Sequence, residues 1–125
     1  MVSKEKFPGL DHLDPGVVYR SLGDSDSRER IGIGFMDKPG VERDNIDLRF
    51  PYYVMVFVLR GRGCYIDRNG HGHPLYPGCF FQRIPEETHS NLIEPQSGWQ
   101  ECFIDIGREL FAAYRTMRII RDDFR

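Results

Sequence analysis

The sequence of 125 residues has few cysteines and no Cys-x-x-Cys pair, which excludes two common ways of stabilising a small domain. Its cysteines are Cys64, Cys79 and Cys102, an odd number. A disulfide framework and a thiolate zinc site are therefore both poor interpretations. We expect free, largely buried thiols in a reducing compartment.

The sequence also lacks a long apolar run and an excess of positive charge. The longest apolar run, Tyr52 to Leu59, is far shorter than the roughly 20 residues that a membrane-spanning helix needs. Residues 1–10 contain no apolar core of a secretory signal. The formal net charge of −2 provides no basic field that would attract nucleic acid. We expect a soluble, cytoplasmic domain that does not enter membranes and does not bind DNA by itself.

Glycine and proline are plentiful, and they separate short runs rich in Val, Ile, Phe and Tyr. This texture is typical of an all-β sandwich or barrel. Arg68-Asn69-Gly70 and Pro77-Gly78 predict tight turns, and the glycine pair Gly61 and Gly63 predicts a bulge or a close backbone approach. Residues 21–29 and 37–47 are polar and are predicted as loops. The predicted strands are Val17–Leu22, Arg30–Met36, Tyr52–Leu59, Gly63–Asp67, Gly78–Ile84, Thr88–Ile93 and Trp99–Ile106.

The segment from Arg108 to Phe124 changes character, because glycine and proline disappear from it. Leu110, Phe111, Tyr114 and Met117 recur at intervals of three and four, which predicts one apolar face of an α-helix.

An ordered set of motifs follows the first apolar strand: VLRGRG from Val58, LYPGCFFQRIPEETH from Leu75, and WQECFIDIG from Trp99. This set resembles the ligand-binding domain of AraC-type transcription regulators. The resemblance implies an all-β, cupin-like double-stranded β-helix (jelly-roll barrel) over residues 1–107, with an N-terminal arm of about residues 1–15. Residues 108–125 would then form a C-terminal helix that begins the linker or dimerisation helix. The family's DNA-binding helix-turn-helix domain is absent from this chain. Where the family usually has Asp after its proline-glycine turn, this sequence has Cys79.

Catalytic cupins hold a metal with two histidines and a glutamate on a first motif and a histidine on a second. Residues 47–57, where the first set should lie, contain no histidine and no glutamate. His89 alone matches the quartet. The pair His71 and His73 follows the Asn69-Gly70 turn and is interpreted as a solvated hairpin arm rather than a metal site. We therefore predict no metal, no cofactor and no catalytic residue, and hence no enzymatic activity.

The resemblance also implies where an effector would bind, namely at Pro8 on the arm and at Lys38, Asn91, Glu101 and Phe103. His89 is a further candidate, with a structural role as the alternative. Trp99 could stack on a sugar or simply fill the core.

The segment Trp99–Ile106 leaves one question of orientation open. Hydrophobicity would turn its aliphatic face inward, whereas the resemblance turns Glu101 and Phe103 inward. Gln82 and Arg83 pose the same question, because neighbours on a strand face opposite ways. An inward Arg83 would favour an acidic sugar such as a uronate.

The leading hypothesis is the effector-sensing and dimerisation domain of an AraC-type regulator, with a small carbohydrate as effector and a homodimer as the assembled form. DNA would then be bound only through the domain that is absent from this chain. Two alternatives are a stand-alone cupin enzyme acting on a sugar and a carbohydrate-binding module without a regulatory role.

Overall fold

The computed structural model describes residues 15–21, 30–38, 43–48 and 51–121. Within these ranges the chain forms nine strands and one helix. In order these are β1 (Gly16–Ser21), β2 (Arg30–Asp37), β3 (Arg43–Leu48), β4 (Tyr53–Arg60), β5 (Gly63–Ile66), β6 (Gly72–Leu75), β7 (Phe80–Arg83), β8 (His89–Ile93), β9 (Gln100–Ile106) and α1 (Arg108–Thr116).

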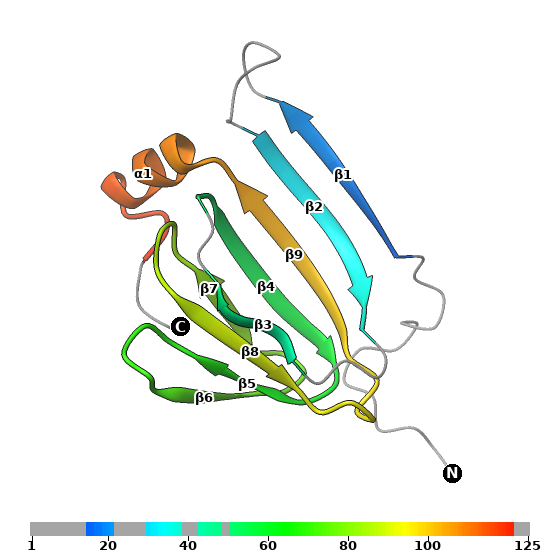
Figure 1. Cartoon of the computed structure of the whole chain (residues 1–125). Helices are drawn as coiled ribbons and strands as arrows, with labels where there is room; N and C mark the ends of the chain where they lie inside the picture. The colour runs from blue at the N-terminus through cyan, green and yellow to red at the C-terminus, as the bar shows by residue number, and fades with distance from the viewer. Residues whose placement is uncertain (1–14, 22–29, 39–42, 49–50, 122–125) are drawn as a thin grey trace.

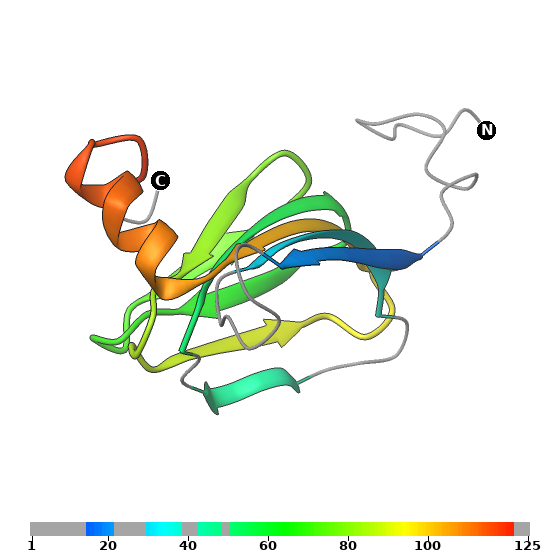
Figure 2. The ribbon, with the colours of Figure 1, turned by 90° about the horizontal axis from the view of Figure 1, so that it is seen from above.

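The strands form two antiparallel sheets that face each other as two layers (Figures 1 and 2). The larger sheet has the strand order β1-β2-β9-β4-β7, and the smaller has the order β3-β8-β5-β6. After β2 the chain crosses repeatedly between the sheets, so strands distant in the sequence become neighbours. The predicted all-β jelly roll with one C-terminal helix is confirmed.

Apolar side chains of both sheets meet between the two layers. Along β4, Val54, Val56 and Val58 are each at most 4% exposed, and they alternate with Met55 and Phe57, which are only half-buried. Burying a side chain of this size contributes roughly 1.5–3 kcal/mol, so this interior fixes which face of each strand points inward. The interior cluster consists of Val54, Val56, Val58, Tyr65, Leu75, Phe81, Ile93, Trp99 and Phe103.

The predicted turns are confirmed by their backbone geometry. Gly70 has φ 79° and Gly78 has φ 95°, conformations that side-chain-bearing residues rarely adopt. At the second turn the backbone N–H of Tyr76 donates to the Sγ of Cys79 at 3.1 Å. The Cys79 thiol thus occupies the position where the resembled family usually has a carboxylate.

Gly61 and Gly63 mark a close approach between backbones, as the sequence predicted. A Cβ at Gly61, where φ is 104°, would lie 2.8 Å from the Cα of Trp99. A Cβ at Gly63 would lie 2.2 Å from the carbonyl oxygen of Leu92. Both distances are too short for any side chain, so these positions require glycine.

Two strands are missing from the predicted set of strands, although the second was expected as a hairpin arm. Residues 43–48, all but the last of them in the expected loop 37–47, form β3, which pairs with β8 through a register that shifts twice. The sequence RDNIDL is poor in β-branched and aromatic residues, so its propensity does not indicate a strand. The four-residue β6 is the second arm of the Asn69-Gly70 hairpin, and its Pro74 is tolerated because β6 is an edge strand.

The C-terminal helix is shorter than the predicted 108–124. It ends at Thr116, and Arg118 adopts a left-handed conformation with φ 60° that turns the chain back. Met117 was expected on the buried face but is 58% exposed, since it already lies beyond the helix. Phe111 stacks on Tyr53 at a centroid distance of 4.9 Å, which anchors α1 on the outer face of the larger sheet.

Candidate functional site

The inner face of β9 carries acidic as well as aromatic side chains. Glu101, Phe103 and Asp105 are buried, as is Trp99 just before the strand, whereas Gln100, Cys102 and Ile104 on the other face are half-buried. The Glu101/Phe103 face therefore points into the barrel, as the resemblance implied. Hydrophobicity alone predicts the wrong orientation, because α1 covers one end of the outer face, where it buries Ile106 and partly buries Ile104.

At one end of this face a lysine, a tryptophan and a glutamate form one cluster. The Nζ of Lys38 lies 2.9 Å from the Oε1 of Glu101, and the indole N–H of Trp99 donates to the same oxygen at 2.9 Å. The Glu101 side chain is 3% exposed and that of Lys38 is 12% exposed. A carboxylate this deeply buried needs such partners. The structure thus brings three of the predicted site residues together.

At the other end of the face lies a second polar cluster, which surrounds Arg83. Arg83 is 8% exposed and shares the inner face of β7 with Phe81. Asn91 of the opposite sheet accepts a hydrogen bond from Arg83 through its amide oxygen, in the orientation in which its amide nitrogen donates to the backbone carbonyl of Ser90. Asp105 lies in the same register row as Arg83, with Val54 between them, and its carboxylate is 3.8 Å from Arg30.

The two clusters are separate. Glu101 and Asp105 are four positions apart on β9, a spacing of about 13 Å. Phe103 and the interior apolar cluster lie between them. Asn91 therefore belongs with Arg83 rather than with Glu101, although the sequence placed Asn91 and Glu101 in one site.

His89 lies on the smaller sheet, beside Asn91. It is 2% exposed, and its ring stacks against Tyr65 at a centroid distance of 6.2 Å. Burial raises the pKa of Tyr65 to about 12, so its phenol stays protonated at neutral pH. The ring of Tyr65 also lies 5.1 Å from that of Phe81, which connects this pair to the core.

The hairpin histidines have a structural partner. The Nε2–H of His73 donates to the carboxylate of Asp67 at 2.9 Å, and this bond holds the pKa of Asp67 below its usual value. His71 lies further from the same carboxylate, at 3.9 Å, and is largely exposed. Among the residues that the structure describes, no group of three or more His, Cys, Asp or Glu side chains is arranged to hold a metal ion.

Sequence reasoning missed part of the polar interior. Pro8, predicted on the arm, lies outside the described residues. Asp105 and Tyr65 were not singled out, although Asp105 continues the alternation that selected Glu101 and Phe103. Arg83 was considered with its direction left open, because only the register of β7 against β4 decides it.

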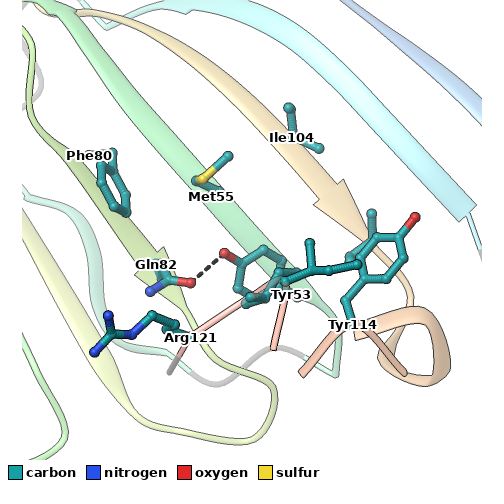
Figure 3. Close-up of a pocket in the computed structure, with 10 residues that line it drawn as sticks. Tyr53, Met55, Phe80, Gln82, Ile104, Tyr114 and Arg121 are labelled. Carbon is teal, nitrogen blue, oxygen red and sulfur yellow. Dashed lines mark hydrogen bonds between the residues drawn. The ribbon is translucent and has the colours of Figure 1, made fainter. Parts of the chain in front are cut away.

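A groove of about 390 Å³ lies on the opposite side of the larger sheet (Figure 3). It is bounded by the outer faces of β4, β7 and β9 and by the turn that follows α1. At its base the hydroxyl of Tyr53 donates to the Oε1 of Gln82 at 2.5 Å. The residues that line it are Tyr53, Met55, Phe80, Gln82, Ile104, Ile106, Tyr114, Ile119, Ile120 and Arg121.

The groove is mainly apolar, and no sequence motif indicated it. It arises where a helix that covers only one end of a sheet leaves the neighbouring strands open. Burial raises the pKa of Tyr53 to about 12, so the Tyr53 hydroxyl remains a donor to Gln82 at neutral pH.

Comparison with known proteins identifies the fold. No family model matches the sequence, and no curated protein matches it. Among solved structures, the cupin domain of Schizosaccharomyces pombe Cnp3 superposes with a TM-score of 0.56 at 12% identity, over 86% of this chain and 77% of that one. A structure of the DMSP lyases RdDddP and RnDddQII gives 0.50 at 18% identity, over 78% of this chain and 43% of that one. Protein NMB1881 from Neisseria meningitidis gives 0.50 at 9% identity, over 75% and 84% of the two chains.

These likenesses define the chain as a cupin-fold β-sandwich, and at such identities they carry the fold alone. Within the described ranges, no helix is both long enough and apolar enough to cross a membrane.

Proposed function

We propose that this cupin-fold domain is the effector-binding and dimerisation domain of an AraC-type regulator, and that its effector is a carboxylated carbohydrate such as a uronate. The observation that carries the proposal is the inward, buried Arg83 beside Asn91. A guanidinium offers a planar fork of donors that matches a carboxylate. A neutral sugar would not require such a group.

The surrounding polar groups suit the rest of a sugar. Asn91 and Asp105 are buried on the same side of the interior as Arg83, and an amide and a carboxylate can both bond hydroxyl groups. Tyr65 and His89 add ring faces and polar ring atoms nearby. A small number of placed polar groups among aromatic walls is the usual composition of a small-molecule site.

In this proposal the Lys38–Glu101–Trp99 cluster supports the binding site more than it contacts the effector. Glu101 already accepts from Trp99 and pairs with Lys38, so the cluster holds the inner face of β9 in place as well as offering a carboxylate to a hydroxyl. Phe103, between the two clusters, would contact the C–H face of a bound ring. Contact through Pro8 and binding of DNA through a further helix-turn-helix domain belong to the same proposal.

A thermal-shift comparison tests the proposal. Galacturonate and glucuronate are compared with galactose and glucose, which lack only the carboxylate. A ligand that binds the folded state raises the melting temperature by mass action, so the uronates should raise it and the neutral sugars should raise it less. Arg83→Gln should abolish the difference, and the exposed Arg62→Gln should retain it. Equal shifts for the acidic and the neutral sugars would refute the assigned effector class.

Metal analysis of the purified protein addresses the competing enzyme hypothesis. A regulatory receptor needs no metal, so dialysed protein should carry a transition metal far below one equivalent. A stoichiometric metal together with no uronate response would favour the cupin enzyme instead.

A further inference from the structure

The outer face of the larger sheet is apolar over most of its width. One register row places Val18, Ile33, Ile104, Met55 and Gln82 side by side on β1, β2, β9, β4 and β7. Only the last of these five is polar. The adjoining row consists of Gly16, Phe35, Cys102, Phe57 and Phe80.

Much of this face is open in the described structure. Val18 is 54% exposed, Ile33 49% and Phe35 37%. α1 lies over the row that contains Tyr53 and Ile106, at one end of the sheet (Figure 2). An antiparallel sheet with one face in water normally alternates polar residues onto that face. A contiguous apolar patch instead marks a surface that something covers.

We propose that a second copy of this chain covers the face, so that two larger sheets pack against each other in a homodimer. Five strands spaced about 4.8 Å apart and up to eight residues long present roughly 600 Å². The groove is part of this area, because Met55, Gln82 and Ile104 of the same face line it. Two such faces would bury roughly 1,200 Å² in total, the lower end of the range for specific interfaces. The inference assigns the dimerisation that the proposed function includes, and it places the interface on the sheet rather than on α1 alone.

The two halves of the face suggest how the copies are arranged. The β1–β2 half carries the most exposed side chains, and the β4–β7 half contains the groove. A two-fold axis in the interface, parallel to the central strand β9, lays the exposed half of each protomer over the groove half of its partner. Self-complementary packing of this kind is typical of two-fold dimers. The same axis places Cys102, on the outer face of β9, opposite the Cys102 of the second copy.

Sedimentation velocity of the whole chain over a range of concentrations tests the interface. The wild type should be a dimer, and Ile33→Asp should weaken association at least tenfold while the melting curve stays cooperative. Val18→Asp, on the edge strand, should weaken it in the same direction. The control Tyr76→Asp alters an apolar residue that is equally exposed but lies outside this face, and it should remain dimeric. A monomeric wild type, including one in which residues 1–14 cover the face, overturns the proposal. A dimer unaffected by Ile33→Asp and Val18→Asp also overturns it.

Cross-linking with a short bismaleimide tests the axis. Facing sheets lie about 10 Å apart, within reach of such a reagent. Protein carrying Cys64→Ser and Cys79→Ser, with Cys102 retained, should form a covalent dimer. Protein carrying only Cys102→Ser should not. A dimer that depends on Ile33 but gives no Cys102 cross-link overturns the arrangement along β9.

The outcomes separate this inference from the effector proposal. A dimer without any uronate response would refute the effector class and leave the interface supported. A monomer with a clear uronate response would do the reverse.

Discussion

The indole N–H of Trp99 and the carboxylate of Glu101 form a hydrogen bond between residues two positions apart on the same face of the larger sheet. Lys38 pairs with the same carboxylate oxygen, so the three side chains act as a unit. Removing one member of a buried ion pair leaves the other charge without compensation.

A double-mutant cycle on Lys38 and Glu101 should therefore show strong coupling. Lys38→Met is expected to lower the free energy of unfolding by about 3 kcal/mol, because it removes the cation that pairs with the buried Glu101 carboxylate. Glu101→Gln retains an acceptor for Trp99 and should cost less. The double variant should be more stable than the sum of the single effects implies. Urea unfolding measures all three, and additive effects would mean that the contact contributes nothing.

The close approach at Gly63 predicts a sharp difference between two glycine positions. Gly63→Ala should destabilise the fold by about 3 kcal/mol or more, because its Cβ would meet the backbone carbonyl of Leu92, which cannot move alone. Gly16→Ala is the matched control. Its Cβ meets nothing within 4 Å, so the change should stay within about 0.5 kcal/mol. Thermal unfolding of both variants provides the comparison, and similar melting temperatures would contradict the register of β5 against β8.

Alkaline stability should depend on the two buried phenols. The pKa values of Tyr53 and Tyr65 are raised from 10.0 to about 12 in the folded state, so the protonated forms are favoured there. Their contribution is therefore complete below pH 10 and is lost as the pH rises toward 12. Denaturant unfolding between these limits should show falling stability, with a smaller fall in Tyr53→Phe. If stability fell with pH equally steeply in Tyr53→Phe and in the wild type, the Tyr53 phenol of the wild type would titrate normally.

The hairpin between β5 and β6 should make the stability of the fold depend on pH in the acid range. The hydrogen bond from His73 is the main cause that lowers the pKa of Asp67 from 3.8. A carboxyl whose folded pKa is depressed stabilises the fold above its unfolded pKa, and this contribution disappears as the pH falls through the folded value. Asp67→Asn should therefore flatten the stability profile below about pH 4. His73→Gln should move the Asp67 titration upward in an NMR experiment, and an unmoved titration would exclude the bond.

The sequence predicted most of the larger sheet because inward and outward residues alternate along its central strands, most clearly at the buried valines of β4. The glycine pair at 61 and 63 and the turn at Asn69-Gly70 were predictable because each requires a particular backbone. β3 was not, since its polar residues become a strand only through pairing with the distant β8. The early end of α1 was equally hidden, because nothing in Met117-Arg118-Ile119 signals a left-handed residue.

The candidate site was predicted unevenly for a related reason. Glu101 and Trp99 could be found from alternation within a single strand. The contact between Arg83 and Asn91 joins two sheets and depends on the register of each. The outer groove depends on the angle at which α1 leaves β9, which no local pattern encodes.

Gln82 and Arg83 are consecutive residues on β7, the edge strand of the larger sheet, with the first against the outer groove and the second in the barrel. A single peptide unit therefore joins a side chain of the outer groove to a side chain of the buried interior. A ligand that displaced the Arg83 guanidinium would tilt β7 and so move the Gln82 amide in the outer groove. The interior and the outer surface would then be coupled directly. The coupling would need only a small tilt of the four-residue β7, which pairs with β4 along one edge.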